Sequence, residues 1–259
     1  MDSREYLYFV QKEIHSTVMA TVDNDGFPVT CAIDIMDCDG KSLYFLTARG
    51  KSLYGRLNKQ GYVALTGMKG RDTLSCVAVS IRGKVRELGA EPLPKLFGKN
   101  PYMSEIYPTE QSRSALTVFQ IYEGTGEWFD LSQKPIERAS FAFGKTEVEK
   151  EGYFITKACT GCRICEAVCP QRCIDFAVIP AAIWQEHCLH CGNCFEQCPV
   201  QAVTKKFEVQ YEWQRKQRLR RGRKAETMLR ARTRTEKDVF SKTERLKQAL
   251  ETADAVLIG

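Results

Sequence analysis

Cys159-Thr-Gly-Cys162-Arg-Ile-Cys165-Glu-Ala-Val-Cys169-Pro170 returns later in the chain as Cys188-Leu-His-Cys191-Gly-Asn-Cys194-Phe-Glu-Gln-Cys198-Pro199. All four cysteines and the closing proline keep their spacing, so every position is displaced by one repeat interval, the separation of Cys159 from Cys188. A short internal repeat of this kind predicts two similar units packed about a pseudo-twofold axis. Gly161 and Gly192 lie inside the two loops, where glycine permits a positive φ and lets backbone amides come close to a bound group.

The spacing of the thiols indicates a metal cluster. A cubane iron-sulfur cluster takes four soft thiolate ligands, and one Cys-x2-Cys-x2-Cys loop can deliver only three of them to one face. The fourth ligand must therefore come from elsewhere in the chain. Zinc is the alternative, because paired Cys-x2-Cys motifs also bind it. The third cysteine, the closing Cys-Pro and the repeat are surplus to what zinc needs.

These motifs resemble the bacterial-type two-cluster ferredoxins over roughly fifty residues, in which the fourth cysteine of each run binds the other cluster. The resemblance implies two 4Fe-4S clusters with crossed ligand sets. One set is Cys159, Cys162, Cys165 and Cys198, and the other is Cys188, Cys191, Cys194 and Cys169. Cys173 lies outside the pattern, and we expect it to be a small core residue.

The first half of the chain reads as short strands separated by Gly and Asp turns, which favours an antiparallel barrel or sandwich. The expected strands cover residues 17–22, 29–35, 42–47, 62–66, 74–87, 115–122 and 126–131. Irregular structure or a short helix is expected over 91–107, where prolines are frequent.

Two stretches in this half, Met19-Ala-Thr-Val-Asp-Asn-Asp-Gly-Phe-Pro28 and Leu43-Tyr-Phe-Leu-Thr-Ala-Arg-Gly-Lys-Ser-Leu-Tyr-Gly-Arg-Leu-Asn58, carry a second resemblance. Together they resemble the pyridoxamine 5'-phosphate oxidase-like split barrel. The resemblance implies an FMN cofactor, whose phosphate binds where a strand leads through a hydroxyl, a glycine and a lysine into a helix. It also implies a homodimer with the flavins at the interface.

The residues at this strand-to-helix junction suit an anion site. A strand ending at Thr47 is followed by two cations and a helix beginning near Leu53, and free helix N-terminal amides attract phosphate. The phosphate candidates are Thr47, Arg49, Lys51 and Ser52. The alternative is an ordinary turn with solvated cations. Trp128 is expected to border the flavin ring near the dimer seam or, failing that, to be a buried core aromatic.

The domain prediction has four parts. Residues 1–131 form the barrel, 132–150 a linker rich in Pro, Gly and charge, 151–205 the two-cluster module, and 206–259 a charged helical tail. The expected fold class is α+β: an antiparallel split β-barrel, then a small ferredoxin-like α+β module and a helical basic tail.

The tail holds most of the positive charge. Between Arg215 and Arg234 ten Lys or Arg and one acid give +9, which leaves the rest of the chain near −3 (6 − 9). We expect a solvated or intersubunit helix, or an arm that docks an acidic protein. Nucleic acid is not the expected partner, because no binding fold accompanies the basic run.

Composition narrows the function to redox chemistry. No apolar run of about 18 residues and no secretion signal occurs, which predicts a cytoplasmic protein without a membrane span. In a reducing cytosol the 12 cysteines indicate metal or redox chemistry rather than disulfides. With three histidines and no GxSxG or HExxH motif, hydrolysis has few candidate residues and no catalytic residue is assigned.

The sequence therefore predicts an FMN-dependent oxidoreductase that relays electrons between a low-potential carrier and FMN through two 4Fe-4S clusters. Its partner would be a redox protein or a small-molecule electron acceptor. One alternative is an electron carrier without its own substrate, whose barrel serves dimerisation and docking. Another is a nucleic-acid-associated iron-sulfur protein.

Overall fold

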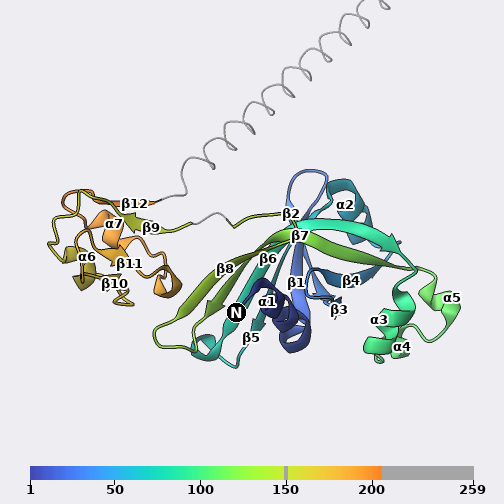
Figure 1. The fold of residues 1–259 in the computed structure, drawn as a ribbon. Coiled ribbons are helices and arrows are strands. Elements are labelled where there is room, and N and C mark those ends of the chain that lie inside the picture. Colours follow the sequence, from blue (N-terminus) through green and yellow to red (C-terminus); the bar gives the residue numbers. More distant parts are fainter. Residues whose placement is uncertain (149–150, 206–259) are drawn as a thin grey trace, which may run out of the picture. The chain divides into compact units, whose positions relative to one another are not determined.

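The computed structural model describes residues 1–148 and 151–205. They form a β-rich N-terminal domain and a small cysteine-rich module (Figure 1). The predicted helical tail 206–259 lies outside the described residues.

One antiparallel sheet of eight strands makes up the N-terminal domain. The strand order is β2-β1-β5-β6-β7-β4-β3, with β8 paired to β7. The strands are β1 Ser16–Val22, β2 Pro28–Asp34, β3 Asp37–Cys38, β4 Leu43–Ala48, β5 Tyr62–Lys69, β6 Val77–Gly89, β7 Leu116–Asp130 and β8 Glu137–Phe143. The predicted antiparallel split barrel is confirmed as a curled half-barrel sheet.

Strand β7 pairs with three other strands of this sheet. One edge pairs with β6, while the other pairs with β4 over Leu116–Ala48 to Ile121–Leu43 and then with β8 from Gly124 to Asp130. The sequence predicted two strands split at 123–125, and this is wrong because β7 runs through without a break. Gly124 allows it: a Cβ there would lie 2.3 Å from the Arg82 carbonyl oxygen, so glycine permits the close approach of β6. Strand β8 lies inside the predicted linker 132–150.

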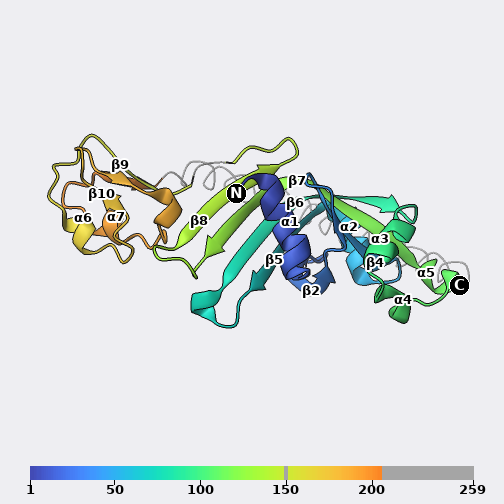
Figure 2. The same cartoon turned by 60° about the horizontal axis from the view of Figure 1, so that its bottom comes forward.

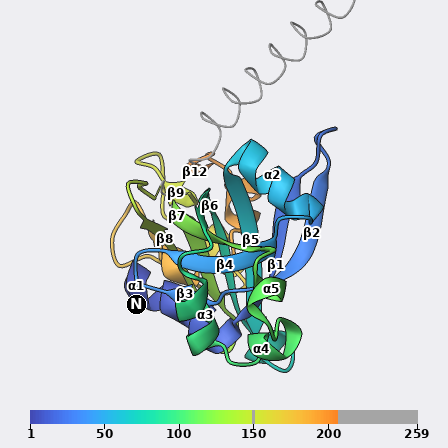
Figure 3. The ribbon, with the colours of Figure 1, turned by 90° about the vertical axis from the view of Figure 1, so that its right-hand side faces the viewer.

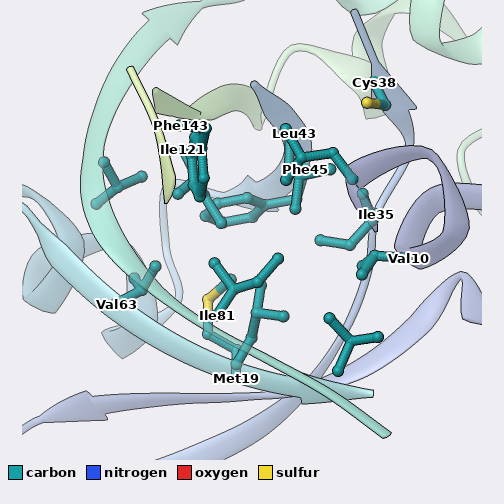
Figure 4. Packing of buried hydrophobic residues seen from close by; sticks show 14 of the residues in the cluster. Val10, Met19, Ile35, Cys38, Leu43, Phe45, Val63, Ile81, Ile121 and Phe143 are labelled. Carbon is teal, nitrogen blue, oxygen red and sulfur yellow. The ribbon is translucent and has the colours of Figure 1, made fainter. Parts of the chain in front are cut away.

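The sheet curls around the main hydrophobic core. Inward-facing Met19, Phe45 and Ile81 are fully or almost fully buried, and Figure 4 shows them clustered inside the curled sheet. Helix α1 (Ser3–Phe9) and the π-helical turn Val10–Ile14 add the fully buried Leu7 and Val10. Each such side chain contributes about 1.5–3 kcal/mol through removal of apolar surface from water.

Helix α2 (Ser52–Gln60) packs on the sheet through the buried Leu53 and Leu57 and ends at Gly61, whose φ of 60° suits a glycine cap. The helix predicted to begin near Leu53 is thus confirmed. The proline-rich segment contains α3 (Leu93–Lys99) and α4 (Met103–Ile106), which cover a second small core, and α5 (Glu110–Arg113) follows them. Figure 3 shows α2 and α3–α5 at different places around the sheet.

The cysteine-rich module consists of short elements. Strand β9 (Tyr153–Ile155) pairs with β12 (Val203–Lys205), and β10 (Ile174–Asp175) pairs with β11 (Ala182–Ile183). Two single-turn helices, α6 (Ile164–Ala167) and α7 (Asn193–Glu196), begin one repeat interval apart, so the sequence repeat is also a repeat of helices. These elements surround a core of their own and are seen from a second side in Figure 2.

Within the two described ranges, no helix combines the length and the apolar character needed to cross a membrane. All twelve cysteines fall in these ranges, and every one is a free thiol.

Candidate cluster and flavin sites

The repeat in the sequence is also a repeat in the backbone. Left-handed residues occur in pairs separated by the repeat interval: Gly161 and His190, Arg163 and Gly192, Arg172 and Gln201. Gly161 and Gly192 have φ values of 75° and 87°, which confirms the conformation expected of the loop glycines. The two loops therefore present their cysteines with the same geometry.

The eight motif cysteines divide into two groups of four around separate hollows. One hollow is lined by Cys159, Cys162, Cys165 and Cys198. The other is lined by Cys169, Cys188, Cys191 and Cys194. The fold thus brings together the two sets that the resemblance implied, each with three cysteines from one loop and one from the other repeat.

Exposure within each group is uneven. Cys165 and Cys194, in the first turns of α6 and α7, are buried, whereas Cys162 and Cys191 are exposed. Each hollow therefore has one exposed motif thiol, while the first has one buried motif thiol and the second has two, Cys188 and Cys194. A group bound in either hollow would approach solvent at the exposed cysteine.

Several of the motif thiols are harder to ionise than a free cysteine. Burial, followed by the charges of neighbouring thiolates, raises the pKa of Cys194 to about 11. Burial also raises the pKa values of Cys165 and Cys188. Four sulfurs so close together cannot all ionise without a compensating cation, and iron binding supplies that charge and displaces the protons.

The geometry of the hollows suits a multi-iron cluster. Across residues 1–148 and 151–205, no three His, Cys, Asp or Glu side chains converge tightly enough for a single metal ion. Four thiols around a wider hollow are the donor set of a cubane cluster. The residues therefore fit 4Fe-4S clusters better than the zinc alternative.

Cys173 was not assigned to the site by its sequence position. It is 2% exposed and lies in the wall of the second hollow, with its sulfur 3.5 Å from the Cys169 sulfur. The internal repeat could have singled out Cys173, because the equivalent position in the second copy is Ala202 and not a cysteine.

The predicted phosphate residues surround the junction of β4 and α2. Thr47 is buried near the end of β4, and its hydroxyl has no hydrogen-bond partner. Lys51 precedes the helix without a side-chain cap, so the amides of Ser52 and Leu53 are available to an anion, whereas the Tyr54 amide donates to the Lys51 carbonyl at 3.0 Å. Lys51 and Ser52 are exposed, while the exposed Arg49 bonds the Ser114 carbonyl oxygen through its guanidinium group.

The Glu87 carboxylate links helix α2 to the sheet through hydrogen bonds. Glu87 of β6 accepts hydrogen bonds from the Thr117 hydroxyl at 2.6 Å, the Tyr54 hydroxyl at 3.2 Å and the Asn58 amide at 3.4 Å. Thr117 is the cross-strand partner of Thr47. Sequence reasoning missed Glu87, since nothing in the chain order brings it near α2.

Trp128 is 6% exposed and packs in the main core, where its ring lies 5.3 Å from that of Tyr6 and 4.8 Å from that of Phe9. In the single chain these aromatic contacts account for its position. That Trp128 borders a flavin remains a prediction.

Comparisons with known proteins agree with this two-part construction. Residues 4–129 match the family described as pyridoxamine 5'-phosphate oxidase, and residues 151–199 match the 4Fe-4S dicluster domain. A crystal structure of a nimc/nima family protein from Clostridium acetobutylicum is 17% identical, with a TM-score of 0.45, and the match covers 54% of this chain and 93% of that one.

Two curated relatives match the cysteine-rich module. A protein named Ferredoxin 7Fe from Hydrogenibacillus schlegelii is 36% identical over 63 residues, which are 24% of this chain and 81% of the relative. NADH-quinone oxidoreductase subunit I 2 of Geobacter metallireducens is 36% identical over 66 residues, 20% of this chain and 48% of the relative. The chain therefore spans about half the length of the latter protein.

A 4Fe-4S dicluster domain transfers electrons, and this gives the chain a redox role. The chain belongs to the dicluster ferredoxins through residues 151–199 and joins that domain to an N-terminal pyridoxamine 5'-phosphate oxidase-like domain.

Proposed function

We propose that the protein is an oxidoreductase in which two 4Fe-4S clusters relay electrons between an external low-potential carrier and an FMN bound by the split barrel. The observation that carries the proposal is the division of eight cysteines into two groups of four around separate hollows. The same chain has a phosphate-type anion site at the start of α2. Clusters move single electrons, whereas a flavin exchanges one or two, so the pair couples a carrier to two-electron chemistry.

The ligand sets follow the two hollows. One cluster is held by Cys159, Cys162, Cys165 and Cys198, and the other by Cys169, Cys188, Cys191 and Cys194. Support comes from the matched backbone of the two loops and from the need for compensating positive charge among the buried thiols. The exposed Cys162 and Cys191 are the proposed points at which electrons enter or leave.

The flavin phosphate is proposed to bind at Thr47, Arg49, Lys51 and Ser52. The buried Thr47 hydroxyl is an orphaned polar group, and such a group is costly unless a partner is present. A phosphate oxygen would supply that partner, while Lys51 and the first-turn amides of α2 would balance its charge. Trp128 is proposed to border the flavin ring near the dimer seam.

Two copies of the chain are proposed to form a homodimer through the outer face of β1 and β5. Val18, Val22, Tyr62 and Met68 are 55%, 42%, 46% and 66% exposed. The register places Val18 beside Thr66 and so puts these side chains on the same outward face. A row of exposed apolar residues on a regular sheet is a surface that a second copy can cover.

The cytoplasm is the proposed compartment, and the twelve free thiols support it because reducing conditions preserve such thiols. The proposed partner is a redox protein or a small-molecule electron acceptor.

The test is to purify the full chain anaerobically and count iron, sulfide and flavin per chain. About eight iron atoms and one FMN are expected, and stepwise reduction under anaerobic conditions should bleach the cluster and flavin bands in the same protein. Eight iron atoms without flavin would instead favour a carrier without its own substrate. Zinc in place of iron would refute the proposal.

A further inference from the structure

A cation lies in the wall of the first hollow, the one lined by Cys159, Cys162, Cys165 and Cys198. This cation is Arg163, and among the described residues that line either hollow it is the only Lys, Arg, Asp or Glu. Its guanidinium carbon lies 5.0 Å from the centre of the Phe176 ring, which belongs to the same wall. The contact between cation and ring therefore holds the positive charge at the first hollow.

The second loop, all of which the structure describes, has glycine at the equivalent position. Arg163 corresponds to Gly192 one repeat interval later, and both residues are left-handed, with φ values of 62° and 87°. A Cβ at Gly192 would lie 3.0 Å from the Tyr153 hydroxyl oxygen, so that loop has little room for a side chain. Glycine adopts this conformation without strain, whereas arginine does not. The first loop thus keeps a strained arginine where the repeat accepts glycine, which indicates a role for the side chain.

The charge of Arg163 acts on the reduction of a cluster in the first hollow. One-electron reduction makes a cluster more negative, so a nearby cation stabilises the reduced form more than the oxidised form. The Arg163 side chain is 62% exposed, and solvent therefore screens part of its charge. Glu166, whose Oε2 lies 3.2 Å from the Arg163 Nη1, offsets a further part. What remains acts more strongly on the first hollow than on the second, because the interaction falls with distance.

We propose that Arg163 makes the cluster of the first hollow the more easily reduced of the two, so that a single electron shared between them resides mainly there. An electron that enters at the second hollow then passes to the first. One cluster is oxidised, the other is reduced, and no proton or outside reactant takes part. Arg163 thus gives the relay a direction that the matched backbone of the two loops does not provide.

This inference rests on the proposed ligand sets and is independent of the flavin. A wild-type count of about eight iron atoms tests the ligand sets. The midpoint potentials of charge variants that keep this count test Arg163. The failure of one can therefore be told from the failure of the other.

The experiment uses the full chain, purified anaerobically and reduced stepwise with dithionite, while electron paramagnetic resonance follows the two midpoint potentials. R163Q is expected to lower the higher potential only, by about 28 mV, which makes that cluster about threefold less reduced at a given solution potential. R163K keeps the charge and should shift that potential less. E166Q removes the opposing charge and should raise the higher potential, and R163Q/E166Q should lie close to wild type.

Lys205→Gln is the matched control. Lys205 lies one repeat interval after Phe176, and its Nζ is 5.9 Å from the centre of the Tyr153 ring, which lines the second hollow. Lys205 itself lines neither hollow. K205Q should therefore change either potential by less than R163Q changes the higher one.

Three results would overturn the proposal: an R163Q protein whose higher potential is not lowered, shifts of the same sign in R163Q and E166Q, or a K205Q shift as large as that of R163Q. Iron counts and circular dichroism check that each variant is loaded and folded. If R163Q loses iron, E166Q decides, since it leaves Arg163 in place. A raised higher potential in E166Q then supports the proposal, and an unchanged or lowered one contradicts it.

Discussion

The Tyr54 hydroxyl on helix α2 donates a hydrogen bond of 3.2 Å to the Glu87 carboxylate on strand β6. With the bonds from Asn58 and Thr117, this contact holds α2 against the sheet and fixes the direction of its N-terminus. Glu87 is thus a positioning residue for the proposed phosphate site, although it touches no predicted phosphate ligand.

Replacing Glu87 should therefore lower both stability and FMN affinity. Glu87→Ala leaves three donors without their acceptor and is expected to cost about 1–3 kcal/mol of unfolding free energy. Glu87→Gln keeps one acceptor oxygen and should cost less. Urea unfolding and FMN fluorescence titration measure the two effects.

Glu127→Ala is the control for Glu87. Glu127 is 50% exposed and pairs with Arg138 at 3.0 Å, and surface pairs of this kind contribute at most about 1 kcal/mol. Equal urea midpoints and equal flavin affinity for the Glu87 and Glu127 variants would contradict the anchoring role.

Removing the Thr47 hydroxyl, which has no hydrogen-bond partner, should maintain or raise protein stability but weaken FMN binding. Thr47→Val removes a buried hydroxyl that has no partner, so the flavin-free protein should be equally stable or more stable by about 1 kcal/mol. FMN affinity should fall about tenfold, because a hydrogen bond to the phosphate of about 1.4 kcal/mol is lost. Flavin titration and unfolding of the flavin-free protein test both parts.

Thr17→Val is the matched control, since the Thr17 hydroxyl is also buried but donates to the Ile33 carbonyl at 2.9 Å. That variant should lose stability without a specific loss of flavin affinity. A Thr47→Val protein that loses stability as Thr17→Val does would show that Thr47 has a structural partner and not a ligand.

The cysteine module could be predicted from the sequence because the spacing of the cysteines is typical of a cluster-binding loop. The resemblance that the two copies of one cysteine spacing carry implied the two groupings that the fold forms. The position of Cys173 in the site was not predicted, because a single thiol outside the motif resembles any small core residue. Its position against Cys169 depends on the turn after Pro170, which no local pattern reveals.

In the barrel, strand order and polar anchors depend on contacts between distant segments. Strand β8 was missed because its sequence, interrupted nearby by Pro135 and Gly144, resembles a linker, and its pairing with β7 decides its conformation. The junction from Thr47 to Ser52 was predictable as a local strand-to-helix motif. Glu87 was not, because its three donors come from α2 and β7.

A pH-dependent contribution to stability is expected from Asp37. Burial alone would raise the pKa of this carboxyl, but hydrogen bonds from Lys99, Lys95 and the Cys38 amide outweigh burial and lower it below its ordinary value of 3.8. The ionised form is thus favoured in the folded state, so its contribution is present above about pH 4 and is lost as the pH falls further.

Asp37→Asn should cost about 1–3 kcal/mol at pH 7, because Lys95 and Lys99 lose a carboxylate that is only 4% exposed. The difference from wild type should shrink as the pH falls below 4. Urea unfolding between pH 7 and pH 3 measures it, with the exposed-loop variant Asp25→Asn as control. A difference that does not change with pH would contradict the ion-pair explanation.

The outer face of β1 and β5 predicts how the proposed dimer can be broken. Val18 and Met68 are 55% and 66% exposed, and a lysine at either position would place a charge in an interface that must be dry to be stable. V18K/M68K should therefore run as a 29.4 kDa monomer, whereas the wild type is expected at twice that mass in light scattering after gel filtration. I106K is the control, because Ile106 is 61% exposed but belongs to α4 and not to either strand. Since the resemblance places the flavin at the dimer interface, the monomeric variant should also bind FMN more weakly. A V18K/M68K protein that remains dimeric would move the interface to another face of the sheet.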